Sequence, residues 1–173
     1  MQPYNVAEAY QIYSLLLPQE ESYGFAKGTL VIQEETISTS PLSAENCLPP
    51  EETNKFKDAI AEYKQLQGKK WSLKRSFQIE KTYEIVSSNT IRLLLKKRAV
   101  YHQGDPFYKR YPGSGGFIVM SPVGFDKQKT LAVVYTGSSC GSLCGLWRFH
   151  LLEKVDGRWK EVPGAGDACV TMS

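Results

Sequence analysis

Residues 135–147 read YTGSSCGSLCGLW and decide the fold of the chain. Two cysteines, three glycines and three serines lie here between the apolar runs Leu131–Thr136 and Leu146–Val155. Glycine and serine favour turns, and both runs have the β-branched and aromatic composition of strands. We therefore interpret the stretch as the tip of a β-hairpin that organises the C-terminal part of a sheet.

Other β-type segments surround this hairpin. They are Phe117–Ser121, Arg158–Val162 and Cys169–Met172. Asp156-Gly157 separates two of the runs, and an Asp-Gly pair in that position is a strong signal for a two-residue hairpin turn. Strands joined by short turns predict an antiparallel meander in this half of the chain.

The N-terminal half begins with an amphipathic helix predicted over Val6–Leu17. Apolar side chains recur there at helical spacing. Asn5 and Glu8 have the spacing of a capping box, in which each side chain accepts a hydrogen bond from a free backbone N–H at the helix start. Pro18 is expected to end the helix, because proline lacks an N–H and its ring crowds the preceding turn.

A second helix is predicted between Pro50 and Gly68. The proline pair before it breaks the preceding loop, and glycine just past the last apolar residue is a common helix end. Its apolar stripe consists of Phe56, Ala59, Ile60, Tyr63 and Leu66. The helical spacing of this stripe predicts one buried face.

Three more segments complete this half. Thr29–Ser38 is rich in β-branched residues and predicts a strand. Polar and apolar residues alternate in Trp71–Ile79, which indicates a half-buried strand or an extended segment. Thr90–Arg98 fits a short helix or a buried strand, because its leucine triplet suits both.

The predicted fold class is α+β. We expect two main helices to pack on one face of a mostly antiparallel, meander-like sheet of five to six strands. A chain of 173 residues fits one domain. Within it, residues 1–100 form a helical and strand part and residues 101–173 form the β-meander.

Charge is distributed unevenly along the chain. Residues 1–63 carry three basic and ten acidic side chains, net −7, whereas residues 64–110 carry twelve basic and three acidic ones, net +9. This asymmetry indicates either an anion-binding face or charged segments that pack together or face solvent. No nucleic-acid-binding module signature accompanies the basic segment, so nucleic acid is not favoured as a partner. The chain also has no run of 18 apolar residues that could span a membrane.

The four cysteines allow several kinds of chemistry. Cys140 and Cys144 have three residues between them across a tight turn, which suits a disulfide and is our preferred interpretation. Free structural thiols, a redox or catalytic thiol and a metal site are the alternatives. Cys47 and Cys169 could form a second pair, although the sequence does not choose among the three possible connectivities. We expect no metal site, because the other candidate ligands lack paired spacing.

A disulfide favours an extracytoplasmic location, periplasmic or secreted. Nothing in the sequence resembles a signal peptide, and we expect that such a segment has already been removed.

The competing enzymatic hypothesis uses the same cysteines. A nucleophilic thiol needs a nearby base, and His102 and His150 are the only histidines. A small hydrolase or thiol enzyme would therefore pair Cys140 or Cys144 with one of them.

The turn-rich, aromatic segment 101–116 is the preferred ligand surface. A long loop without periodicity is more often functional than a plain connection. Its candidate contact residues are Tyr101, His102, Asp105, Tyr108, Arg110, Tyr111 and Ser114. Backbone amides at the glycine-rich tip could add an anion-binding nest.

Four motifs give the chain a resemblance to a group of uncharacterised bacterial proteins. The motifs are FYKRYPGSGG at 107–116, SPVGF at 121–125, CGSLCG at 140–145 and LLEKVDGRW at 151–159. The resemblance covers residues 104–173, with a weaker similarity near the N-terminus. It implies a bacterial source and, for some members, export, but it implies no activity.

These observations together favour a non-enzymatic extracytoplasmic binding or structural domain. Its surface would consist of the 101–116 loop and the 137–145 tip, with an anionic ligand or a protein as the possible partner. No cofactor is expected.

Overall fold

The computed structural model describes residues 1–20, 28–38, 43–95, 105–141, 144–164 and 169–172. The helices among them are α1 (Ala7–Glu20), α2 (Ala44–Cys47), α3 (Pro50–Lys55), α4 (Lys57–Leu66), α5 (Ser88–Leu95) and α6 (Pro106–Arg110). The strands are β1 (Gln2–Pro3), β2 (Leu30–Gln33), β3 (Trp71–Ser72), β4 (Tyr83–Val86), β5 (Phe117–Met120), β6 (Gly124–Phe125), β7 (Leu131–Gly141), β8 (Cys144–Val155), β9 (Arg158–Glu161) and β10 (Val170–Met172).

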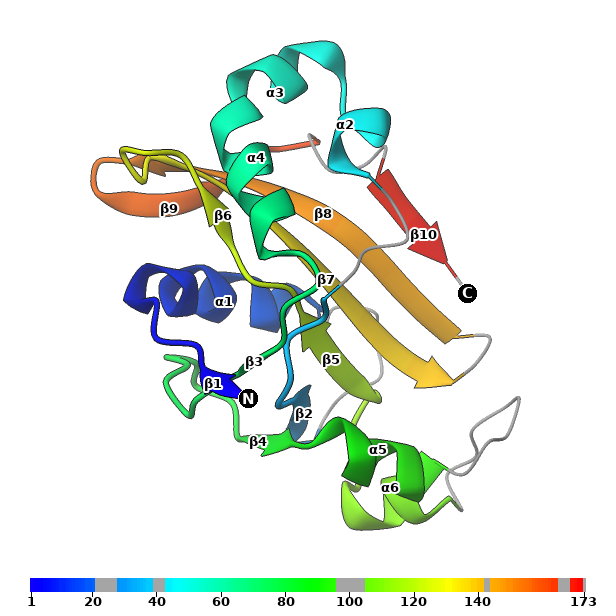
Figure 1. Ribbon diagram of the computed structural model, residues 1–173. Coiled ribbons are helices and arrows are strands. Elements are labelled where there is room, and N and C mark those ends of the chain that lie inside the picture. Colours follow the sequence, from blue (N-terminus) through cyan, green and yellow to red (C-terminus); the bar gives the residue numbers. More distant parts are fainter. Residues whose placement is uncertain (21–27, 39–42, 96–104, 142–143, 165–168, 173) are drawn as a thin grey trace.

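The long antiparallel pair β7–β8 forms the centre of the main sheet. Its register runs from Leu131 opposite Glu153 to Gly141 opposite Cys144, so residues 135–147 do form the end of a hairpin. Across the sheet the strand order is β10-β8-β7-β5-β2-β4, with β6 paired to β7 and β9 paired to β8. Figure 1 shows this hairpin running diagonally across the molecule.

The sheet is mixed, and the prediction of a mostly antiparallel meander was wrong. Strand β2 pairs in parallel with both β4 and β5. In the described residues the sheet contains eight strands rather than five or six. A parallel neighbour requires a crossover connection, and here residues 87–116 with α5 and α6 connect β4 back to β5 on the other side of β2. The α+β class is confirmed.

Side chains of the central hairpin alternate between two apolar cores. Ala132 and Val134 pack into the core that contains α1, whereas Val133 and Tyr135 pack into the core that contains α4. The two main helices therefore lie on opposite faces of the sheet, and not on one face as predicted. Figure 1 shows α1 and α4 separated by the strands.

A third core lies where α5 and α6 cover one end of the sheet. Val31 of β2, Ile91 of α5 and Phe107 of α6 are buried in it, with Phe117 of β5 packed against them. Phe117 is opposite Ser139, which points to the same face as Tyr135, so α5 and α6 cover the face that α4 also covers.

Local boundaries differ from the predicted ones in two helices. α1 continues through Pro18 to Glu20, since a proline in the last turn sacrifices only one backbone hydrogen bond. The helix predicted after Pro50 is divided into α3 and α4, because Phe56 ends one and begins the other. The ambiguous segment 90–98 is helical over its described part, as α5.

Candidate functional site

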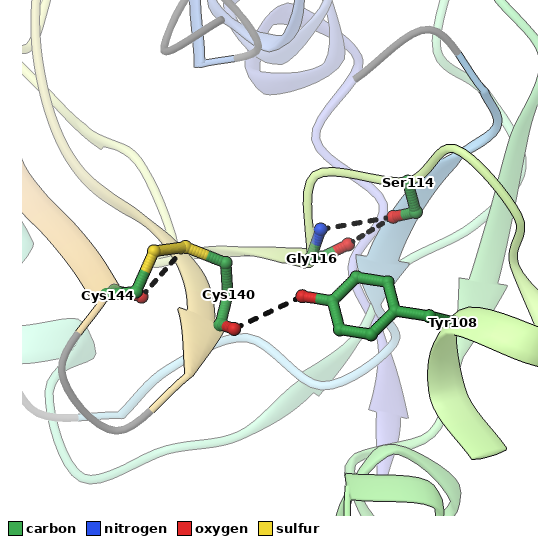
Figure 2. The surroundings of a disulfide bond; sticks show 5 residues. All are labelled: Tyr108, Ser114, Gly116, Cys140 and Cys144. Carbon is green, nitrogen blue, oxygen red and sulfur yellow. Dashed lines mark hydrogen bonds between the residues drawn. A yellow bond between two sulfur atoms is a disulfide. The ribbon is translucent and has the colours of Figure 1, made fainter. Parts of the chain in front are cut away.

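The hairpin tip contains the predicted cysteine pair. Cys140 is the second-last residue of β7, within a register shift between Ser139 and Gly141, and Cys144 begins β8. Their Cα atoms are 5.1 Å apart and their sulfur atoms lie at disulfide-bonding distance (Figure 2). Cys140 is half-buried and Cys144 is exposed. The pair therefore cross-links the adjoining ends of β7 and β8, the two longest strands. This cross-link is accessible to solvent.

A hydrogen bond attaches helix α6 to this tip. The phenol of Tyr108 donates to the backbone carbonyl oxygen of Cys140, with the two oxygens 3.1 Å apart (Figure 2). The neighbouring Phe107 is fully buried in the third core and holds α6 against the sheet. The loop and the tip, which the sequence singled out separately, thus form one continuous surface.

The turn after α6 is fitted against the backbone of the tip. The hydroxyl of Ser114 donates to the carbonyl of Gly116 and accepts from its N–H, at 2.6 and 3.2 Å. Gly116 has φ of +113°, a conformation that L-residues with a side chain rarely adopt. A Cβ at this position would lie 2.1 Å from the carbonyl oxygen of Ser139. Only glycine allows this close approach.

The predicted ligand residues of the loop have different environments. Tyr101 and His102 lie outside the described residues. Asp105, Tyr111 and Ser114 are buried. Their side chains support the loop and are not part of its outer surface.

Two of the predicted residues do reach the surface. Tyr108 is half-buried, and Arg110 is exposed with its guanidinium 3.9 Å from the carboxylate of Glu84. Arg110 also lies over the ring of Tyr111, 5.4 Å from its centroid. We define the tip–α6 surface as Tyr108, Lys109, Arg110, Cys140 and Cys144.

His150, the other candidate base, belongs to a different part of the sheet. It lies opposite Val134, six residues along β7 from Cys140. At the usual rise of a strand this is a separation of about 20 Å. His150 is therefore too far from the tip to take a proton from either cysteine.

His150 has its own polar partners inside the sheet. Its Nε2 is 2.7 Å from the hydroxyl of Thr136, and its Nδ1 is 2.5 Å from a carboxylate oxygen of Glu161. The row links β7, β8 and β9. Thr136 is only 1% exposed and His150 is fully buried, so this threonine hydroxyl is closed to a substrate. The arrangement fixes the orientation of the imidazole and joins three strands.

This row of three residues was not predicted from the sequence. His150 lies within the predicted strand Leu146–Val155, but its contacts with Thr136 and Glu161 were not predicted. The Asp156-Gly157 turn contains the missing information, because it fixes Val155 opposite Arg158 and hence Glu161 opposite Leu152.

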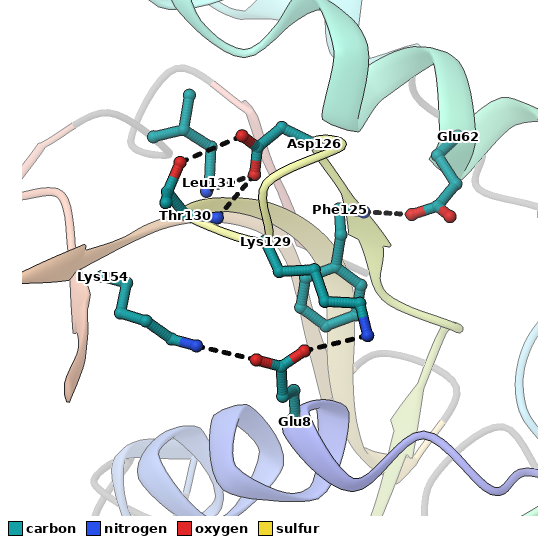
Figure 3. A network of polar contacts seen from close by, with 8 residues as sticks. All are labelled: Glu8, Glu62, Phe125, Asp126, Lys129, Thr130, Leu131 and Lys154. Atoms are coloured by element: carbon teal, nitrogen blue, oxygen red, sulfur yellow. Dashed lines mark hydrogen bonds and ion pairs between the residues drawn. The ribbon is translucent and has the colours of Figure 1, made fainter. Parts of the chain in front are cut away.

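A charged cluster joins the first turn of α1 to the sheet (Figure 3). Lys154 of β8 donates to one carboxylate oxygen of Glu8 at 2.7 Å, and Lys129 lies 3.1 Å from the other. The hydrogen bond from Lys154 is the main cause that holds the pKa of Glu8 below its ordinary value. The predicted capping box was therefore wrong, since the Glu8 carboxylate pairs with two lysines.

The turn beside this cluster is held by Asp126. Burial raises the pKa of its carboxyl, but hydrogen bonds from the backbone N–H groups of Leu131 and Thr130 outweigh burial and hold the pKa below its ordinary value. Both N–H···O distances are 2.7 Å, and the Thr130 hydroxyl donates to the other carboxylate oxygen. Figure 3 shows the turn closed around this side chain.

The other kinds of site considered from the sequence are a metal site, a second cysteine pair and a membrane span. No group of three or more His, Cys, Asp and Glu side chains there is arranged to hold a metal ion. Cys169 is disulfide-bonded, while the side chain of Cys47 lies outside the described part of the structure. None of the described helices is both long and apolar enough to cross a membrane.

Comparison of the chain with family models, with curated proteins and with solved structures finds no match. No activity therefore carries over from a known protein.

The fit of the α6 turn against the tip predicts the effect of Gly116→Ala. The substitution should lower the free energy of unfolding by about 3 kcal/mol, because it combines an unfavourable φ with a backbone clash. Gly68→Ala is the matched control, since Gly68 also has positive φ but no atom lies within 4 Å of the added Cβ. That variant should lose about 1 kcal/mol. Urea unfolding measures both, and equal losses would contradict the close approach.

The Glu8 cluster predicts a pH-dependent contribution to stability. Because the folded pKa of Glu8 is lowered, the carboxylate stabilises the fold above about pH 4.5 and this contribution is lost as pH falls through the folded value. Glu8→Gln should cost about 1 kcal/mol at pH 7 and clearly less at pH 3.

Urea unfolding at the two pH values measures this difference. Glu45→Gln removes the exposed ion pair with Lys64 and serves as the control, with an expected loss below about 0.5 kcal/mol. A loss in Glu8→Gln that is the same at pH 3 and pH 7 would rule out the ionic contribution.

Proposed function

We propose that this chain is a non-enzymatic binding or structural domain of an oxidising, extracytoplasmic compartment, and that the tip–α6 surface is its contact surface. The observation that carries the proposal is the hydrogen bond from Tyr108 to the Cys140 carbonyl. This hydrogen bond joins α6, which has exposed basic side chains, to the hairpin tip that the cysteine pair cross-links. The surface is therefore preorganised for binding.

The chemistry of this surface favours an anionic ligand or an acidic protein face. Lys109 and Arg110 are exposed at the end of α6, and within the described part of the chain the acidic partner of Arg110 is Glu84, 3.9 Å away. Tyrosine and arginine are residue types that contribute strongly to binding at protein interfaces. The net charge of +9 over residues 64–110 adds a long-range attraction for anions.

The compartment follows from the cysteine pair. Disulfides persist in oxidising environments and are rare in reducing ones. Cys144 is exposed, so a reducing cytoplasm would have access to the bond. The resemblance to bacterial proteins, some of them exported, supports a periplasmic or secreted location in a bacterium.

A small hydrolase or thiol enzyme is the competing proposal. It requires a free thiolate at Cys140 or Cys144 and a base beside it. The sulfur atoms lie at bonding distance from each other, and His150 is engaged with Thr136 and Glu161. Both observations favour the binding domain. His102 lies outside the described residues.

Alkylation followed by mass spectrometry separates the two proposals. In the unreduced native protein we expect iodoacetamide to leave Cys140 and Cys144 unmodified, and digestion to yield them as one linked peptide. After reduction both should become alkylated. Free thiols at these positions in the unreduced protein would refute the Cys140–Cys144 disulfide. Rapid modification of one of them at neutral pH would favour the thiol-enzyme proposal.

Retention on immobilised heparin, a polyanion, tests the contact surface. The double variant Lys109→Gln/Arg110→Gln should elute at clearly lower salt than the unmodified chain, because two exposed charges are removed from one patch. Lys127→Gln/Lys160→Gln is the matched control, because both lysines are exposed and lie away from α6 and the tip, Lys127 between β6 and β7 and Lys160 on β9. Equal elution of the two double variants would show that anions do not prefer the tip–α6 surface.

A further inference from the structure

A pocket of about 390 Å³ lies between the first turns of α1 and the extended segment 74–78. It is separate from the tip–α6 surface, on the side of the molecule where Figure 1 shows β1, β3 and the start of α1. This volume falls within the range of small-molecule sites. Its polar lining consists of Asn5, Gln11, Lys74, Ser76 and Gln78.

The wall of this pocket is fixed at both ends by hydroxyl groups of α1. The backbone N–H of Lys74 donates to the phenol oxygen of Tyr10 at 2.7 Å, and that of Gln78 donates to the hydroxyl of Ser14 at 2.8 Å. Tyr10 in turn donates to the carbonyl of Tyr4 at 3.0 Å. These hydrogen bonds hold the segment 74–78 in one conformation without a ligand, which lowers the entropic cost of binding.

The side chains around the pocket are available to a ligand. None of the five polar lining side chains makes a hydrogen bond or ion pair with another residue in the described part of the chain. The buried rings of Tyr4 and Tyr10 form the inner boundary. The pocket thus combines an ordered wall with unpaired polar groups.

The charge of the lining limits the class of ligand. Lys74 is its one charged residue, so the pocket suits a single negative charge. The side-chain amides of Asn5, Gln11 and Gln78 each offer both donors and acceptors, as does the hydroxyl of Ser76. Sugar hydroxyls also donate and accept, so neutral groups of this kind complement a polyhydroxylated molecule.

We infer that this pocket binds a small hydroxylated carboxylate, a sugar acid being the simplest member of the class. The ammonium group of Lys74 binds the carboxylate, and the amide side chains bind the hydroxyl groups. This site is additional to the tip–α6 surface, and neither depends on the other.

NMR titration of the isotope-labelled full chain tests the inference with D-glucuronate, D-glucose and acetate as probes. Glucuronate should shift the amide resonances of residues 5–11 and 74–78, with a Kd in the millimolar range or below. Glucose and acetate each supply only half of the chemistry and should bind at least about tenfold more weakly. No shifts at about 20 mM glucuronate, or shifts confined to other residues, would overturn the inference.

Two substitutions test the assigned roles. Lys74→Gln should weaken glucuronate binding about tenfold, whereas Lys160→Gln, an exposed lysine on β9, should leave it unchanged. Tyr10→Phe keeps the ring but removes the hydrogen bond between the phenol and the backbone N–H of Lys74. We expect this variant to bind glucuronate several-fold more weakly. Circular dichroism should confirm that it is folded. Undiminished binding in Lys74→Gln would refute the site. The tip–α6 surface takes no part in this measurement, so either proposal can fail alone.

Discussion

The register of the β7–β8 hairpin determines which side chains reach each face of the sheet. Val133 and Tyr135 meet α4 on one face, and Ala132 and Val134 meet α1 on the other. A shift of one residue would exchange the two sets and also separate His150 from Thr136. The two-residue turn at Asp156-Gly157 extends the same register to β9. Both cores and the buried polar row therefore depend on one alignment of strands.

Periodicity and turn residues were sufficient to predict several of the local elements. The Asp156-Gly157 hairpin, the strands around it and the stripe of α4 could all be read from neighbouring residues. The arrangement of these elements could not. The parallel pairing of β2 with β4 and β5 joins segments far apart in the chain, and no local pattern encodes that choice. Likewise, the spacing of Asn5 and Glu8 suited a capping box, but the distant Lys154 competes for the same carboxylate.

For the candidate surfaces, too, the sequence predicted the local segments but not how they are arranged. The sequence identified the aromatic loop and the cysteine tip, but it could not show that Tyr108 joins them or that Tyr111 and Ser114 are buried. An aromatic or hydroxyl side chain in a loop has the same appearance in the sequence whether it faces solvent or supports its own turn. The pocket beside α1 was also beyond reach, because Tyr10 and Ser14 meet residues 74 and 78 only in three dimensions.

The position of β2 has a consequence for how the chain assembles. Val31 pairs with Phe117, 86 positions later, so one edge of an apolar strand stays open until the second half of the chain exists. At ordinary rates of synthesis this delay is on the order of ten seconds. The hairpin β7–β8, in contrast, closes from neighbouring residues as soon as it emerges. We therefore expect the C-terminal hairpin to offer the surface on which β2 completes its pairing, although β2 is made first.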